Sequence, residues 1–291
     1  MAALGFVGTG TMGAPMVHCL AAAGHAPLVH DAAPDAARRV AERDGLAVAA
    51  TLKDLAGCGT VILMLPNSAI VRSVCLGDGG LAAHLAPGSV VVDMSSSDPV
   101  ETRAIGEALA AAGIVLLDAP VSGGVRKAVD GTLAIMLGGD DAAAMDAVEP
   151  VLASMGRVFR AGPLAAGHAT KALNNYVSAA GLVAACEAVI MARAFGLDPA
   201  RMTEIINAST GRNNSTENKV AQFILSENYR EAGFALSLMA KDVGLAAALA
   251  GATGKPLPGV AAVAEIWARA EAGLGAGADH TEIHRYLEAL E

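Results

Sequence analysis

Short runs of β-branched and other apolar residues alternate with alanine-rich amphipathic stretches through the first half of this chain. Such alternation is typical of α/β proteins, in which helices cover both faces of a parallel sheet. It therefore predicts an α/β N-terminal domain. The runs that we interpret as strands are residues 4–8, 26–31, 60–65, 89–94, 114–120, 132–139 and 157–162.

The strand signal stops at about residue 165, and helical patterns follow, separated by glycine and proline at 196–199 and 254–259. A chain of 291 residues exceeds the usual size of a single core. Gly162 and Pro163 mark the change of pattern. We therefore expect two domains, residues 1–164 and an all-helical C-terminal domain over residues 165–291.

The charge balance limits the possible partners. Twenty basic and 29 acidic residues give a formal net charge of −9, which argues against nucleic acid and anionic membranes as partners. No basic segment precedes the first apolar stretch, and no apolar run of about 18 residues is free of charge. We expect a cytoplasmic protein with no membrane span, whose partner is a small molecule.

The cysteines and histidines do not form a metal-binding pattern. Cys19, Cys58, Cys75 and Cys186 contain no Cys-x-x-Cys pair, and the histidines at 280 and 284 lack the remaining residues of a zinc set. We interpret the cysteines as reduced thiols and predict no metal site.

The stretch "GFVGTGTMGAPM" follows the first predicted strand and opens a helix. The spacing Gly-x-Gly-x-x-Gly permits a tight turn and lets backbone N–H groups approach a pyrophosphate at a helix N-terminus. In this position it predicts a Rossmann-type dinucleotide-binding domain, although a glycine turn alone is a weak signal. The predicted cofactor-binding residues of this loop are Gly8, Gly10, Thr11, Met12 and Gly13.

Asp31 ends the second predicted strand. A carboxylate there can accept hydrogen bonds from both ribose hydroxyls and repels a 2′-phosphate. It favours NAD as the cofactor, with NADP possible; the alternative is an aspartate that only caps a helix.

A second glycine-rich turn follows the predicted strand at 114–120, in "DAPVSGGVRKAVDGTLAIMLGG". Backbone N–H groups after Ser122, Gly123 and Gly124 can hold a carboxylate without a formal positive charge. The alternative is a plain strand-to-helix turn, which is equally consistent with these residues.

The stretch "GHATKALNNYVSAAG" carries one polar stripe on an otherwise apolar helix. Lys171, Asn174, Asn175 and Ser178 stand at i, i+3, i+4 and i+7, and so share a face. A single lysine among amides suggests a lined cavity; the alternative is an ordinary surface lysine. A lysine acts as a general acid or base when desolvation or a neighbouring positive charge lowers its pKa from about 10.4.

Together these motifs resemble the β-hydroxyacid dehydrogenase family, which includes 3-hydroxyisobutyrate dehydrogenase and tartronate semialdehyde reductase. The resemblance runs nearly end to end and adds "DMSSSDP", "FALSLMAKDVGLA" and "DHTEIHRYLE" to the three stretches above. It implies an NAD(P)-dependent oxidoreductase that interconverts a small β-hydroxy acid and its semialdehyde or ketone.

The resemblance also implies roles for individual residues. Lys171 matches the catalytic acid/base, and Asn175 matches the residue that orients the reacting oxygen. The remaining matches are Ser122, Gly123 and Gly124 for the substrate carboxylate, Phe234 and Asp242 for other substrate contacts, and Leu65, Pro66, Ser96 and Lys241 beside the cofactor.

Two departures from the family pattern concern the substrate. The family usually has threonine at the position of Ser96, a change that keeps the hydroxyl. The stretch "STGRNNSTENK" is more polar than we expect opposite the methyl group of 3-hydroxyisobutyrate. Arg212, Asn213 and Asn214 in it favour a hydroxylated or second acidic group, as in glycerate, serine or tartronate semialdehyde.

Other classes fit less well. No lysine stands four residues after Tyr176, Tyr229 or Tyr286, which excludes the Tyr-x-x-x-Lys pair of short-chain dehydrogenases. Imine reductases usually replace the lysine that matches Lys171. A catalytically inactive nucleotide-binding scaffold stays an alternative from a different class. The family, and apolar stretches such as 181–196, lead us to expect a homodimer or homotetramer.

Overall fold

The computed structural model describes residues 3–275 and 277–290. The chain forms two compact units, Met1–Lys171 and Ala172–Glu291, which we call the N-terminal unit and the helical unit. The division falls inside the long helix α7, Ala166–Phe195, so that the first turns of this helix belong to the N-terminal unit.

The N-terminal unit contains an eight-stranded sheet with the order β2-β1-β3-β4-β5-β7-β6, and β8 also pairs with β7. Every predicted run overlaps a strand, which confirms the predicted α/β class. The strands are β1 Ala3–Val7, β2 Leu28–His30, β3 Cys58–Leu63, β4 Val90–Asp93, β5 Val115–Asp118, β6 Val121–Ser122, β7 Leu133–Gly138 and β8 Gly156–Gly162.

The predicted parallel sheet has one antiparallel edge. Strands β1 to β5 are parallel, whereas β7 runs antiparallel to β5 and to the unpredicted strand β6. Only the short helix α5, Gly124–Val129, separates β6 from β7. A connection of this length reverses the chain but is shorter than most parallel crossovers.

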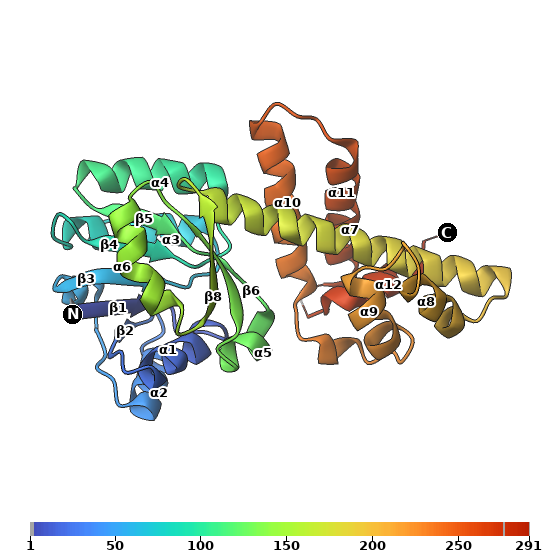
Figure 1. Cartoon of the computed structure of the whole chain (residues 1–291), viewed down its shortest axis with the longest axis horizontal. Coiled ribbons are helices and arrows are strands. Elements are labelled where there is room, and N and C mark those ends of the chain that lie inside the picture. The colour runs from blue at the N-terminus through green and yellow to red at the C-terminus, as the bar shows by residue number, and fades with distance from the viewer. Residues whose placement is uncertain (1–2, 276, 291) are drawn as a thin grey trace. The chain divides into compact units, whose positions relative to one another are not determined.

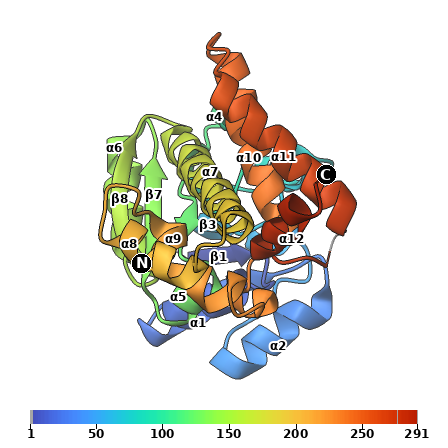
Figure 2. The ribbon, with the colours of Figure 1, turned by 90° about the vertical axis from the view of Figure 1, so that its right-hand side faces the viewer.

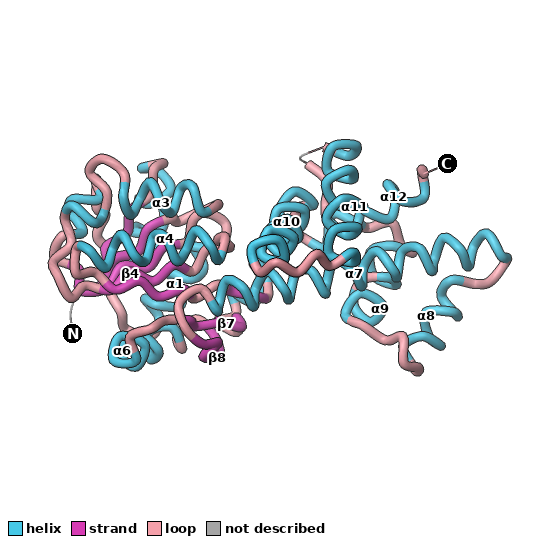
Figure 3. Tube along the Cα trace, turned by 90° about the horizontal axis from the view of Figure 1, so that it is seen from above, coloured by secondary structure: helices cyan, strands magenta, loops and turns pink. Residues whose placement is uncertain are grey.

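Helices cover both faces of the sheet (Figures 1 and 3). Side chains of α1, Gly13–Ala22, α2, Pro34–Asp44, and α6, Ala142–Leu152, pack in one core with Phe6 and Ile62. Side chains of α3, Ser68–Leu76, and α4, Pro99–Ala111, pack in a second core with Val7 and Leu63. Neighbouring strand residues thus point to opposite faces, as the two-residue period of a strand requires. Short 3₁₀ helices also occur at Leu52–Leu55 and Leu81–Ala83.

The described part of the helical unit contains no strand beyond an isolated bridge between Ala235 and Asp279. Leu182 and Cys186 of α7 pack there with Trp267 and Ile283. Helices α10 and α11 lie side by side (Figures 1 and 2). The elements after α7 are α8 Pro199–Asn207, α9 Asn214–Asn218, a π-helical turn Val220–Ile224, 3₁₀ turns Tyr229–Ala232 and His280–Glu282, α10 Leu236–Ala252, α11 Pro258–Leu274 and α12 Ile283–Glu288.

Helix α7 has the length and hydropathy of a membrane span, and 39% of its most apolar window is buried. Core helices of water-soluble proteins have the same properties. The core of the helical unit includes Ala179, Leu182, Cys186 and Val189 of α7, which supports the interpretation of α7 as a core helix.

Candidate active site

The loop between β1 and α1 contains three glycines, and the physical reason for having glycine differs among the three positions. Gly8 has a φ of 98°, and a Cβ there would lie 2.2 Å from the Met64 carbonyl oxygen. A Cβ on Gly13 would lie 1.9 Å from the Gly8 carbonyl oxygen. Chain packing therefore explains Gly8 and Gly13.

Among the described residues, no packing contact requires glycine at position 10. Gly10 is exposed, its φ lies outside the left-handed region, and a Cβ there would meet no atom within 4 Å. A glycine at the free tip of this loop fits a ligand that approaches the backbone closely, as a pyrophosphate does in Rossmann domains. Thr11 is also exposed, and Met12 is the N-terminal cap residue of α1.

Asp31 forms hydrogen bonds with the same loop. Its Oδ2 accepts hydrogen bonds from the Thr9 N–H at 2.7 Å and the Thr9 hydroxyl at 3.1 Å, and its Oδ1 accepts from Ala33 N–H at 2.8 Å. The side chain is only partly buried, so these bonds orient a carboxylate whose remaining lone pairs can accept from a ligand.

The loops after β3 and β4 lie together at the carboxyl ends of neighbouring parallel strands. Leu65 N–H donates to Ser95 Oγ at 2.9 Å, and Leu65 is followed by the exposed Pro66. Ser96 is partly exposed next to the buried Ser95. Dinucleotides bind outside the carboxyl ends of parallel strands at the point where the strand order reverses, which in this sheet lies between β1 and β3.

The turn after β6 has the conformation that its glycines permit. Gly123 and Gly124 have φ values of 133° and 66°, which side-chain-bearing residues rarely adopt. Ser122 pairs with Ala134 of β7, and Gly123 and Gly124 are exposed at the start of α5. Since α5 has only six residues, its backbone N–H groups matter here more than its dipole.

The first turn of α7 packs closely on the sheet. A Cβ on Gly167 would lie 2.0 Å from the Met136 carbonyl oxygen and 3.0 Å from Pro120 Cδ. Asp118 at the end of β5 accepts hydrogen bonds from the N–H groups of Ala165 and His168, both at 2.8 Å. The helix that carries Lys171 therefore starts in contact with Asp118 and Pro120, which shortly precede Ser122 in the sequence.

The predicted polar stripe forms on α7. Lys171 and Ser178 are partly buried, Asn174 is exposed, and Asn175 is buried at 5% exposure. Asn175 Nδ2 donates to Asp242 Oδ2 of α10 at 2.5 Å.

Asp242 also has a neighbouring cation. Lys241 Nζ lies 3.5 Å from Asp242 Oδ1, an oxygen that is buried without a hydrogen bond among the described residues. Three predicted site residues of the helical unit are therefore in direct contact: Asn175, Lys241 and Asp242.

Phe234 is held through its backbone. Its N–H donates to Asp279 Oδ2 at 2.9 Å, its carbonyl oxygen accepts from His280 N–H at 2.8 Å, and its ring meets the His280 ring edge-on. The "DHTEIHRYLE" stretch thus fixes the position of Phe234.

Several side chains of the polar stretch at 209–219 are used within the stretch itself. Asn213 accepts hydrogen bonds from Ser215 and Thr216 N–H as the cap of α9, and Arg212 pairs with Glu217 at 3.7 Å. Asn214 is the exposed first residue of α9. Lys219 differs, because burial lowers the pKa of its ammonium to about 8, although Asp279 and Cys186 act in the opposite direction.

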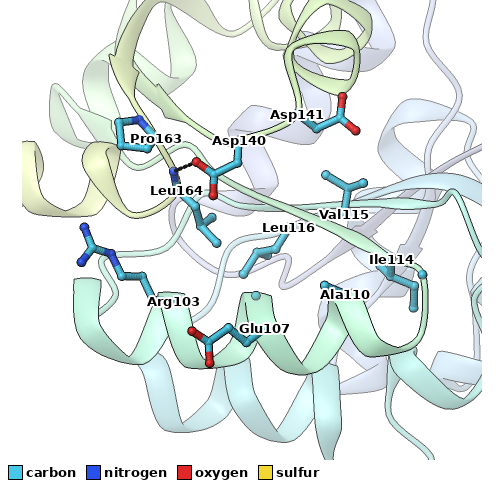
Figure 4. A pocket seen from close by; sticks show the side chains of 12 residues that line it. Arg103, Glu107, Ala110, Ile114, Val115, Leu116, Asp140, Asp141, Pro163 and Leu164 are labelled. Atoms are coloured by element: carbon cyan, nitrogen blue, oxygen red, sulfur yellow. Dashed lines mark hydrogen bonds between the residues drawn. The ribbon is translucent and has the colours of Figure 1, made fainter.

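A pocket of about 750 Å³ lies elsewhere in the N-terminal unit (Figure 4). Arg103, Glu107, Asp140 and Leu164 are among its lining residues, and Asp140 accepts a hydrogen bond from Leu164 N–H. None of the predicted site residues lines it.

The four cysteines are free thiols. In the described ranges, no group of three or more His, Cys, Asp and Glu side chains is arranged to hold a metal ion.

The sequence interpretation did not identify His168 as a site residue. Its side chain is 0% exposed between Asp93 and Asp118, one turn before Lys171. Two features of the sequence could have indicated this residue. His168 stands at the start of an otherwise apolar helix, and an aspartate ends each of two neighbouring strands.

Two family descriptions match the chain. The NAD-binding domain of 6-phosphogluconate dehydrogenase matches residues 3–190, and the NAD-binding domain of NADP-dependent 3-hydroxyisobutyrate dehydrogenase matches residues 165–287. Together they cover both units.

Two named dehydrogenases are similar to this chain over most of its length. The 2-(hydroxymethyl)glutarate dehydrogenase of Eubacterium barkeri is 35% identical over 94% of this chain and 90% of its own length. The NAD-dependent L-serine dehydrogenase of Pseudomonas aeruginosa is 37% identical over 90% of each chain.

A solved structure of the 3-hydroxyisobutyrate dehydrogenase of Mycobacterium tuberculosis with L-serine superposes with a TM-score of 0.90 at 32% identity, covering 99% of this chain and 100% of the other. The Rossmann-type fold, the helical C-terminal region and the predicted family are thus confirmed. The chain belongs to the β-hydroxyacid dehydrogenase family and is an NAD(P)-dependent oxidoreductase of small hydroxy acids.

Proposed function

We propose that Lys171 is the general acid/base of this enzyme and that Asn175 orients the reacting oxygen. In the oxidative direction, Lys171 accepts the hydroxyl proton of the β-hydroxy acid as the hydride leaves its carbinol carbon. The nicotinamide ring, when bound, supplies the hydride acceptor. Support comes from the spacing on α7, where residues 171 and 175 share one face, and from the contact between Asn175 and Asp242.

The substrate carboxylate binds the backbone N–H groups at Ser122, Gly123 and Gly124 in this proposal. The left-handed conformations of the two glycines expose the peptide groups of this turn, and Gly167 lets α7 approach Pro120, two residues before Ser122. Anchoring the acid end fixes the distance from the reacting carbon to Lys171, and such positioning lowers barriers by several kcal/mol.

The dinucleotide binds along Gly8, Gly10, Thr11, Met12 and Gly13, with Leu65, Pro66, Ser96 and Lys241 nearer the nicotinamide. The single observation that carries this assignment is Gly10, where a Cβ would meet no atom of the described residues within 4 Å. Phe234 and Asp242 complete the substrate contacts.

NAD is the preferred cofactor in this proposal because the oriented Asp31 carboxylate repels a 2′-phosphate. Asp31→Ser should lower the preference for NAD over NADP, measured as the ratio of the two kcat/KM values. An unchanged ratio would contradict the role of Asp31.

The substrate is a small β-hydroxy acid such as 3-hydroxyisobutyrate. A second candidate class is polar or dicarboxylic acids. In the segment at 209–219, Arg212 pairs with Glu217 and Asn213 caps α9. The buried ammonium of Lys219 is the group of this segment that favours an acidic substrate. The relatives include a 2-(hydroxymethyl)glutarate dehydrogenase, which fits this class.

A spectrophotometric screen tests the proposed function. NADH and NADPH formation is followed with 3-hydroxyisobutyrate, D-glycerate, serine, 3-hydroxypropionate, 4-hydroxybutyrate, threonate and 2-(hydroxymethyl)glutarate. Turnover of at least one acid is expected. Dinucleotide binding without turnover of any would favour the inactive scaffold instead.

The assembly we propose is a homodimer or homotetramer in the cytoplasm, with the domains divided near residues 164 and 165. Val177, Met191 and Phe195 of α7 are 67%, 64% and 83% exposed, which supports burial by a second copy. Light scattering of the purified chain measures the number of subunits.

A further inference from the structure

His168 joins three elements of the N-terminal unit through its imidazole. Its Nδ1 lies 2.8 Å from Thr102 Oγ1 of α4, and its Nε2 lies 3.0 Å from the Ser95 carbonyl oxygen after β4. The ring itself is fully buried on the first turn of α7.

The two hydrogen-bond partners determine the number of protons on the ring. The Ser95 carbonyl oxygen can only accept. The Thr102 hydroxyl lies 2.9 Å from the Asp98 carbonyl oxygen and can donate its single proton there, which leaves Oγ1 to accept from His168. With the Thr102 proton on the Asp98 carbonyl oxygen, both ring nitrogens donate, as they do in an imidazolium.

Two buried carboxylates balance this charge. Asp93 Oδ2 lies 3.7 Å from Nε2 and Asp118 Oδ2 lies 3.8 Å from Nδ1, and both aspartate side chains are at most 2% exposed. A neutral ring would leave two buried carboxylates without this compensating cation, and uncompensated buried charge is strongly destabilising.

Burial acts on two other titratable groups of this cluster. Burial raises the pKa of Asp118, and the nearby His168 opposes that rise. Cys75 of α3 lies near Asp93, and burial raises the pKa of its thiol, so that it stays neutral. Helix α4 contributes the hydroxyl of Thr102.

The same contacts reach the predicted cofactor loops. Ser95, which accepts from His168 through its carbonyl oxygen, also accepts from Leu65 N–H through Oγ at 2.9 Å. Asp93 accepts from Ser95 N–H at 2.9 Å and from the Ser97 hydroxyl at 2.7 Å. One imidazole therefore connects the loops after β3 and β4 to the helix that carries Lys171.

We propose that His168 is a positioning residue: as a doubly protonated ring it fastens the first turn of α7, and with it Lys171, to the carboxyl ends of β4 and β5. The kinetic part of this proposal rests on the proposed role of Lys171, whereas the protonation of the ring does not.

The protonation is tested on the whole chain labelled with ¹⁵N-histidine. At pH 7, the resonances that disappear in His168→Gln should both have the shifts of protonated ring nitrogens. One unprotonated nitrogen at this pH would overturn the proposal, whatever the activity.

The positioning role is tested by kinetics. His168→Gln should lower kcat by about 10- to 100-fold, because small displacements of a catalytic group are costly, while dinucleotide affinity changes less than about threefold. Thr102→Val should act in the same direction, and Thr102→Ser, which keeps the acceptor, should restore kcat.

The matched control is His18→Gln, because His18 is 56% exposed and pairs with a single carboxylate, Asp44. It should leave kcat unchanged. A folded His168→Gln variant with the wild-type kcat would overturn the positioning role. If the wild type itself oxidises no β-hydroxy acid, the proposed function fails, and the nitrogen shifts still decide the charge of His168.

Discussion

Asn175 Nδ2 donates a hydrogen bond to Asp242 Oδ2 at 2.5 Å, which joins α7 to α10 across 67 residues of sequence. Because a carboxylate only accepts, this contact determines which end of the amide is the nitrogen. Asn175 Oδ1 accepts from Asn174 Nδ2 at 3.0 Å. These two contacts orient the amide.

Asp242→Asn removes the charge that orients this amide and allows it to rotate. We expect kcat to fall by about 10- to 100-fold, as for other losses of positioning in an active site. Steady-state kinetics with the best acid from the screen would measure this. The control is Asp141→Asn, since Asp141 caps α6 and asparagine caps equally well. Equal kcat in the Asp242 variant and the wild type would show that Asn175 needs no partner.

Lys171→Ala removes the proposed proton acceptor. We expect turnover to fall by at least about 100-fold, because general acid/base catalysis contributes about 10²- to 10⁴-fold. Dinucleotide binding, followed by fluorescence quenching, should persist. Lys53→Ala is the matched control, since Lys53 is an exposed lysine of the same unit. Unchanged turnover of the Lys171 variant would end its assignment as the acid/base.

The local features of the fold could be predicted from the sequence. Apolar periodicity located the strands, and Asp98 and Pro99 predicted the start of α4, where Asp98 accepts from Val100 N–H. The direction of β7 could not be predicted, because it depends on the short reversal through α5 rather than on the composition of the strand.

Contacts between residues far apart in the sequence could not be predicted, for a physical reason. Asp31 binds Thr9, and His168 contacts Asp93 and Asp118, only because parallel strands bring their carboxyl ends together. Periodicity assigns a residue to a face, but it does not identify which polar group of another element completes its hydrogen bonds.

The glycine loop offers a matched pair of substitutions. Gly10→Ala should leave the melting temperature nearly unchanged, because its Cβ meets no atom within 4 Å, but should weaken dinucleotide binding by at least about tenfold. Gly13→Ala places a Cβ 1.9 Å from the Gly8 carbonyl oxygen and should destabilise the fold itself. Calorimetry and a binding titration on both variants separate the two effects. A Gly10→Ala variant with wild-type affinity would contradict the assignment of Gly10.

Lys219 predicts a pH-dependent stability difference. Burial lowers the pKa of this ammonium from 10.5 to about 8, so the unfolded chain binds more protons than the native state between these pH values. The stability of the wild type relative to Lys219→Met therefore rises as pH increases through this window. Below pH 8 the native wild type bears the full cost of burying the charge.

Lys219→Met should thus be more stable than the wild type at pH 7, by at most about 3 kcal/mol, and the difference should shrink toward pH 10. Urea unfolding of both proteins at the two pH values measures it. Lys255→Met, at an exposed lysine of the same unit, should show no comparable change with pH. A stability difference that is the same at both pH values would mean that Lys219 is charged at no cost in the native state.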